Sequence, residues 1–182
     1  MTSEVLRERY AHRFRAHDTD GDGWVSQDDF VRRARQLVDG LGEPADSARA
    51  KALVDGVRES WRSIADIAGV PVDGRIDEER FVAALAGAYD SGIVADIMRP
   101  SVAAHVALVD RDGNGRVDEG EFVAAQQAAG IGADDARTAF SLLDRDGDGM
   151  LTISEWQSAV LEFYTSTGSD VPGVRVLGMK AG

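Results

Sequence analysis

The chain has 182 residues, of which 43% are hydrophobic, so it suits one compact folded domain or two small ones and not a disordered chain. Its 32 acidic residues outweigh its 20 basic residues, which disfavours a nucleic-acid binder or a protein held by charge on an anionic membrane. Cysteine is absent, which excludes disulfides, thiolate metal sites and cysteine nucleophiles. Neither a signal stretch nor a run long enough for a membrane helix is visible, so we expect a cytoplasmic protein.

The chain begins with an amphipathic pattern that leads into an acidic loop. Residues 3–17 predict a helix capped by Ser3, with His12 and His17 on its polar face or at its end. The next twelve residues, 18–29, place carboxylates at positions one, three, five and twelve, and glycine at position six. Calcium takes about six to eight oxygen ligands, so a short loop must turn several oxygens inward, and the glycine permits that turn. The spacing predicts an EF-hand calcium loop.

The last position of this first loop departs from the usual pattern. Asp29 stands where glutamate is normal, and its side chain is one methylene shorter. Binding a cation with both carboxylate oxygens would therefore require the following helix to move inward. We expect the first loop to be less selective for calcium and to tolerate Mg²⁺.

A second loop frame, residues 69–80, keeps the spacing but lacks the chemistry. With Gly74 at the sixth position, Arg80 occupies the twelfth, so a cation stands where the main carboxylate belongs. This loop is predicted to be free of metal. It can still brace the first loop through a short antiparallel contact between the two eighth-position residues, Val25 and Ile76.

Residues 90–100 join the two halves and carry several apolar side chains, so they are expected to pack against the protein. Pro100 is predicted to begin a helix that runs through Val109. His105 in that helix is expected to be a packing residue, because neither cysteine nor a second histidine lies at metal-ligand spacing.

Two further loops, residues 110–121 and 144–155, carry the complete pattern and both end in glutamate. A glutamate at the twelfth position is long enough to reach back with both oxygens. Val117 and Leu151 occupy the eighth positions and are predicted to pair, as Val25 and Ile76 are. We expect these two loops to form the high-affinity unit.

The predicted metal ligands are side-chain oxygens and, at each seventh position, a backbone carbonyl oxygen. They are Asp18, Asp20, Asp22, Trp24 and Asp29 in the first loop, Asp110, Asp112, Asn114, Arg116 and Glu121 in the third, and Asp144, Asp146, Asp148, Met150 and Glu155 in the fourth. The predicted division places one pair of loops in residues 1–90, the other in 91–165, and a partly docked tail in 166–182.

Four loop frames, with the first, third and fourth complete and the second degenerate, resemble the sarcoplasmic calcium-binding protein family, particularly its bacterial, calerythrin-like members. The resemblance implies an all-α fold in which four EF-hands form two pairs packed into one compact domain, with short β contacts between paired loops. It also implies a role in binding cytosolic calcium.

The sequence favours a monomeric calcium buffer or transporter that binds three ions. A sensor that engages a protein target stays open, although four methionines are few for the Met-rich surfaces that sensors use. A photoprotein would need histidine, tyrosine and tryptophan around an apolar cavity, and no motif places these residues together. No catalytic constellation is visible, so an enzyme is not expected.

Overall fold

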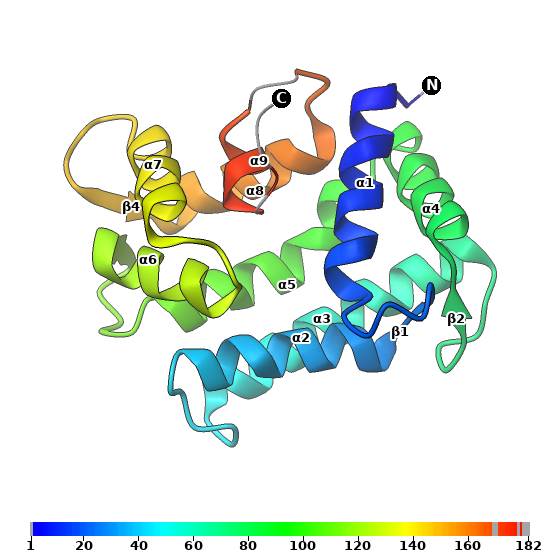
Figure 1. Ribbon diagram of the computed structural model, residues 1–182, viewed down its shortest axis with the longest axis horizontal. Helices are drawn as coiled ribbons and strands as arrows, with labels where there is room; N and C mark the ends of the chain where they lie inside the picture. The colour runs from blue at the N-terminus through cyan, green and yellow to red at the C-terminus, as the bar shows by residue number, and fades with distance from the viewer. Residues whose placement is uncertain (1, 169–170, 178, 180–182) are drawn as a thin grey trace.

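The computed structural model describes residues 2–168, 171–177 and 179 and is built from helices joined by loops. In chain order the elements are α1 (Glu4–His17), β1 (Val25–Ser26), α2 (Gln27–Gly40), α3 (Ala48–Ala68), β2 (Arg75–Ile76), α4 (Glu78–Asp90), α5 (Val94–Val109), β3 (Arg116–Asp118), α6 (Glu119–Ala128), α7 (Ala133–Leu143), β4 (Met150–Thr152), α8 (Ile153–Thr165) and α9 (Pro172–Val176). The unit of helix, loop, short strand and helix occurs four times along this order (Figure 1).

The loops are joined in pairs by two small antiparallel sheets. In the first sheet Val25 lies opposite Ile76, and in the second Val117 lies opposite Leu151. All four side chains are fully buried, so each strand pair links two loops and also contributes to the hydrophobic core. The predicted fold, with short β contacts between paired loops, is confirmed.

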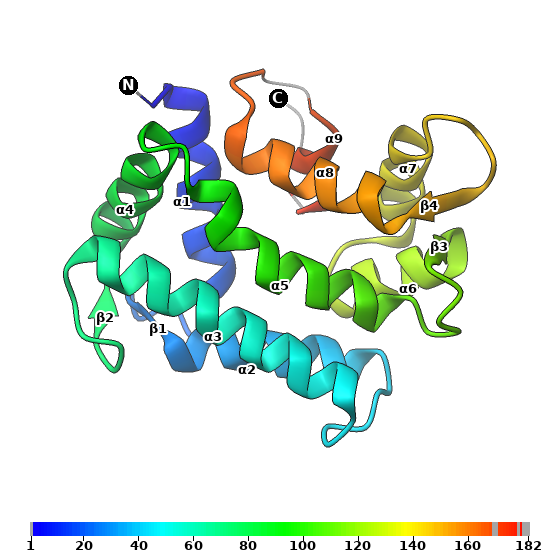
Figure 2. The same cartoon turned by 180° about the vertical axis from the view of Figure 1, so that it is seen from behind.

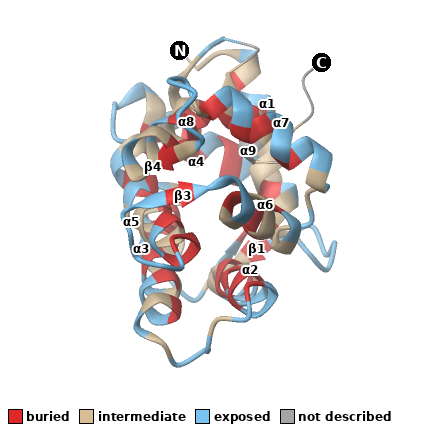
Figure 3. Ribbon diagram, turned by 90° about the vertical axis from the view of Figure 1, so that its left-hand side faces the viewer, coloured by how far each residue is buried: buried red, intermediate tan, exposed pale blue. Residues whose placement is uncertain are grey.

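One hydrophobic core runs through both halves of the chain. A single cluster of buried residues contains Trp61 of α3 and Trp156 of α8, and the buried faces of the helices turn inward while the loops are largely exposed (Figure 3). Between the halves, α3 packs along α5 (Figure 2). Their backbones approach closely at Gly56, where a methyl group would lie 2.9 Å from the carbonyl oxygen of Pro100.

The N-terminal helix is bound to the C-terminal end of α8. The buried guanidinium of Arg9 donates hydrogen bonds to the carbonyl oxygens of Phe163 and Ser166 at 3.2 and 2.7 Å. Tyr10 donates to the carbonyl oxygen of Tyr164 at 2.7 Å. Carbonyl groups at a helix C-terminus are unpaired within the helix and carry partial negative charge, so a cation stabilises them. The first and last parts of the chain are thereby held together.

The described part of the tail docks on the second half, as expected. The short helix α9 contacts α7 and α8, and Val174 is buried. Gly173 approaches the carbonyl oxygen of Ala159 so closely that no side chain fits there. Residues 169–170, 178 and 180–182 of the predicted tail lie outside the described residues.

Pro100 does not begin a helix, and that prediction is wrong. Helix α5 starts six residues earlier, at Val94, and contains Pro100 in its interior. Proline inside a helix costs about 3 kcal/mol because it removes a hydrogen bond and crowds the preceding turn. Burial of Ile97 and Met98 in the turn before it offsets this cost, and Ser60 of α3 donates to the Ile97 carbonyl oxygen at 2.8 Å. The expectation that this connector packs is correct.

Among the described residues, no single helix is long and apolar enough to cross a membrane. Helices α4 and α5 have that length and apolar composition only when taken together, and the chain bends by 107° between them.

The close approach at Gly56 gives a direct test of the contact between the halves. Gly56→Ala should lower the free energy of unfolding by about 1–3 kcal/mol, because the new methyl group forces the α3 and α5 backbones apart. Gly87→Ala is the matched control, since Gly87 is also helical but has nothing within 4 Å of the added methyl group. That substitution should stabilise by about 0.5–1 kcal/mol. Urea unfolding in saturating calcium measures both, and equal stabilisation by the two would contradict this view of the interface.

Candidate metal sites

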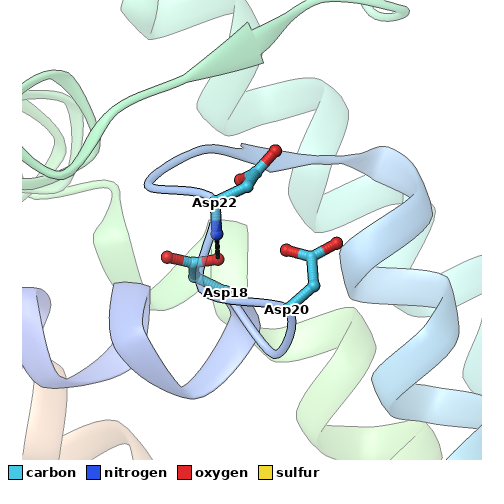
Figure 4. Close-up of side chains that lie close together, drawn as sticks. All are labelled: Asp18, Asp20 and Asp22. Carbon is cyan, nitrogen blue, oxygen red and sulfur yellow. Dashed lines mark hydrogen bonds between the residues drawn. The ribbon is translucent and has the colours of Figure 1, made fainter.

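The first acidic loop connects α1 to α2 and gathers three carboxylates (Figure 4). Side-chain oxygens of Asp18, Asp20 and Asp22 all lie within 4.8 Å of one another. The loop holds its shape with its own backbone, because the Asp18 carboxylate accepts hydrogen bonds from the amides of Asp22 and Gly23, both at 3.1 Å. The same side chain therefore faces the cluster and closes the loop.

Two glycines give each acidic loop its curvature. In the first loop Gly21 and Gly23 have φ values of 69° and 80°, a region in which residues with a side chain are strained. The corresponding glycines in the third and fourth loops, Gly113, Gly115, Gly147 and Gly149, repeat these values within about two degrees. The sixth-position glycine was expected from the sequence. The fourth-position glycine was not, although the repeated Asp-Gly pairs already indicate it.

The third and fourth loops also gather three carboxylates each, although the third takes one of them from its twelfth position. Oxygens of Asp110, Asp112 and Glu121 lie within 4.8 Å of one another, as do those of the three aspartates of the fourth loop, at positions 144, 146 and 148. Asn114 lies beside the third cluster, where its amide donates to Asp112 at 2.8 Å. The seventh-position residues stand where loop and strand meet: Arg116 and Met150 begin β3 and β4, and Trp24 precedes β1.

The twelfth-position carboxylates are also helix caps. Each lies in the first turn of the exiting helix and bonds back to the N-cap residue three positions earlier, which is a capping box. Glu121 belongs to its acidic cluster, whereas Asp29 and Glu155 lie outside theirs and accept from Ser26 and Thr152 at 2.8 and 2.9 Å. The structure thus brings only one of the three twelfth-position groups together with the other predicted ligands of its loop.

The second loop adopts a different backbone. Gly74 does not take the left-handed conformation, and its amide instead donates to the Pro71 carbonyl oxygen at 2.8 Å. The indole of Trp61 donates to the Val72 carbonyl oxygen at 2.8 Å, which ties the loop to α3. No cluster of three metal-ligating side chains occurs in this loop, all of which the structure describes. Its geometry fits the predicted role as a metal-free brace.

Arginines cross between paired loops and meet a fifth-position aspartate. Arg116 of the third loop contacts Asp148 of the fourth at 2.6 Å, and this hydrogen bond lowers the pKa of the Asp148 carboxyl. In the other pair Arg75 approaches Asp22 at 4.0 Å and lies over the Trp24 ring at 4.6 Å. These contacts were not predicted from the sequence, because the arginine and the aspartate belong to different loops.

The donor set suits a hard divalent cation. Two unit charges 4 Å apart repel by about 1 kcal/mol in bulk water and about 4 kcal/mol at an effective dielectric constant of 20. In the third loop, where Asp110 is buried, three carboxylates held this close therefore favour binding of a cation that neutralises them. Oxygen donors without sulfur or imidazole are the ligands that calcium and magnesium prefer. The paired loops and these clusters define an EF-hand calcium-binding protein.

Comparisons with known proteins agree with this class. Residues 136–161 match the model of the EF hand, and residues 9–37 match that of the EF-hand domain pair. Calerythrin of Saccharopolyspora erythraea is 28% identical over 90% of this chain and 94% of its own length. A Streptomyces coelicolor calcium-binding protein of known structure is 35% identical over 90% of this chain and 99% of its own, with a TM-score of 0.74. A sarcoplasmic calcium-binding protein from amphioxus is 16% identical, with coverage of 99% and 100% and a TM-score of 0.74.

The chain therefore belongs to the EF-hand calcium-binding proteins and is calerythrin-like. It binds calcium through its EF-hand loops, and the family is not one of enzymes. Photoproteins such as clytin share the fold.

The structure also assembles residues that the sequence left apart. His12, His17 and His105 line one partly open cavity together with Trp156 and Tyr164. No motif in the sequence places such groups together, but the packing of α1, α5 and α8 does. His17 ends α1, as one of the two expectations held, but it is buried, and its ring stacks on Phe30 with centroids 3.8 Å apart.

The arginine between the third and fourth loops should oppose cation binding. Arg116→Ala frees Asp148 and removes a positive charge beside the site, so calcium affinity of the fourth loop should rise about two- to fivefold, the range expected for an exposed ion pair. Arg111→Ala is the control, because it removes an equal charge from the third loop without touching Asp148. Site-resolved NMR titration with calcium distinguishes the two. An unchanged fourth-loop affinity in the Arg116 variant would show that the ion pair has no influence on the site.

Proposed function

We propose that the protein is a calcium buffer or transporter that binds three ions per chain. The observation that carries the proposal is that three loops repeat one backbone geometry around three carboxylates each, whereas the second loop does neither. A cation bound to such a loop stabilises the folded chain by mass action, because the unfolded chain holds no preformed site.

The proposed ligands are those predicted from the sequence. In each complete loop they are the side chains at positions one, three, five and twelve and the carbonyl oxygen at position seven. The twelfth-position carboxylates of Asp29 and Glu155 would exchange their bonds to the N-cap residues for bonds to the ion. The Asp29 carboxylate would also leave Arg32, which contacts it at 2.8 Å.

The first loop is proposed as the site that tolerates Mg²⁺. Its twelfth-position carboxylate is short, and Arg32 holds it and also contacts Asp20 at 3.4 Å. Fewer oxygens favour the octahedral geometry of Mg²⁺ over the larger coordination shell of calcium.

Exchange of the twelfth-position residues tests this difference. Asp29→Glu should raise the calcium affinity of the first loop several-fold and increase its preference for calcium over Mg²⁺, because the longer side chain reaches the ion with both oxygens. The reciprocal variant Glu121→Asp should shift the third loop the other way. Competition of Mg²⁺ with calcium, followed by NMR at each loop, measures both. Calcium preference that is equal at all three loops of the unmodified chain would refute the proposal.

Burial of the apolar surface supports a buffer. The helix faces of both halves already form one core, and Met98, a residue of the flexible type that sensors use in target grooves, is buried within it. A protein in this state has little apolar surface to offer to a target helix.

A calcium-dependent regulator is the second candidate. The Streptomyces coelicolor relative is described as acting in prokaryotic calcium-mediated regulation. If this chain acts in the same way, calcium must change a surface that a protein target recognises.

Calorimetric titration with calcium in physiological Mg²⁺, together with binding of an apolar dye, separates the candidates. A buffer should bind three ions and lose dye as it becomes more compact. A regulator should bind the dye more strongly when calcium is present. Four bound ions would overturn the prediction that the second loop is free of metal.

The monomeric state, the absence of nucleic-acid and membrane partners, and the location in the cytoplasm stay predictions from the sequence.

A further inference from the structure

A partly open cavity lies between the two halves, and His17 and Phe30 in its wall directly flank the first calcium loop. It measures about 380 Å³, within the range of roughly 300–1,000 Å³ typical of small-molecule sites. Its walls come from both halves and are mostly apolar; they include Leu37 of α2, Val57 of α3, Val102 of α5 and Val160 of α8. A ligand that filled it would exchange apolar surface with both halves.

The charged side chains of this cavity are all basic. Arg13 of α1 and Arg33 of α2 line it, and none of the described lining residues is an aspartate or a glutamate. Arg33 donates to the carbonyl oxygen of Ala16 at 2.7 Å. The Nε atom of Arg13 is buried and has no hydrogen-bond partner among the described residues.

Burial lowers the pKa of His105 to about 4, so this histidine adds no charge to the cavity at neutral pH. Burial and the neighbouring Arg13 lower the pKa of Arg33 to about 10, so the Arg33 guanidinium stays protonated at neutral pH. His17 Nδ1 is also buried and has no partner among the described residues.

Arg13 and Arg33 are partly buried cations that face no acidic side chain among the described residues of the cavity, and such an arrangement is energetically unfavourable. The rest of the chain is strongly acidic, with a net charge of −12, yet none of that charge among the described residues faces the cavity. An anion with an apolar part would offset this free-energy cost, because its charge would pair with the arginines and its apolar part would contact the aliphatic walls.

We propose that the cavity binds a small amphipathic carboxylate, with its apolar part among the aliphatic walls and its carboxylate at Arg13 and Arg33. A guanidinium matches a carboxylate with two parallel hydrogen bonds, which makes this pairing both strong and selective. None of the residues that line this site is a predicted calcium ligand, and the proposal does not depend on whether the chain is a buffer or a regulator.

A series of probes that differ only in the head group tests the proposal on the unmodified chain. Octanoate, 1-octanol and octylammonium are titrated by calorimetry into the calcium-saturated protein. About one octanoate should bind per chain. The affinity for 1-octanol should be lower by about tenfold or more, and the affinity for octylammonium should be lower still. Octanoate should also shift the NMR signals of the His105 ring and the Trp156 indole. Equal binding of octanoate and 1-octanol, or octanoate binding that leaves these two signals unmoved, would overturn the proposal.

Variants with matched controls assign the head group to the two arginines. Arg13→Gln and Arg33→Gln should each weaken octanoate about tenfold and leave 1-octanol unchanged. Arg15→Gln and Arg35→Gln remove the same charge from exposed positions on the same helices and should change neither probe. Calcium stoichiometry and the helical circular dichroism signal report that each variant is folded. An equal loss in all four variants would show that only overall charge matters and would overturn the proposal; if a cavity variant does not fold, the probe series on the unmodified chain decides.

Discussion

Mutual repulsion of carboxylates is the constraint on which this structure depends. Each of three loops holds three acidic side chains within 4.8 Å of one another, which only a cation relieves. The loops keep this arrangement because left-handed glycines bend the chain and backbone amides donate to the first aspartate. The paired strands then fix each loop to its neighbour. The helices connect the loops to one common core, so a calcium ion bound to a loop would also stabilise the folded chain.

The loops were predictable because their information is local. Twelve residues suffice to identify the acidic positions, the turn glycine and the eighth-position contact. Non-acidic residues at positions one, three and twelve of loop 69–80 (Gly69, Pro71 and Arg80) identified the degenerate copy. Helix α1 was equally accessible, because Ser3 and the apolar period mark its start and its buried face. The all-α fold in two pairs was implied by the resemblance to the sarcoplasmic calcium-binding protein family, which rests on the number and order of the copies.

Features that depend on distant partners were not predictable. The start of α5 was misplaced because burial of Ile97 and Met98 against the other half outweighs the local effect of Pro100. The ion pair of Arg116 with Asp148 joins two loops, so neither loop alone indicates it. The cavity is the extreme case, since Arg13, Arg33 and His105 come from three helices and share no pattern in the sequence. The four-residue interval between Arg13 and His17, which places both on one face of α1, was the single local signal.

The contact of α1 with the end of α8 has a consequence for synthesis of the chain. Arg9 and Tyr10 are made at least 154 residues before their acceptors at Phe163, Tyr164 and Ser166. During translation the first pair of loops emerges without these partners, and the buried guanidinium of Arg9 has no carbonyl groups to satisfy it. The native position of α1 is therefore completed only after the chain through Ser166 has left the ribosome, whatever the order in which the calcium loops fill.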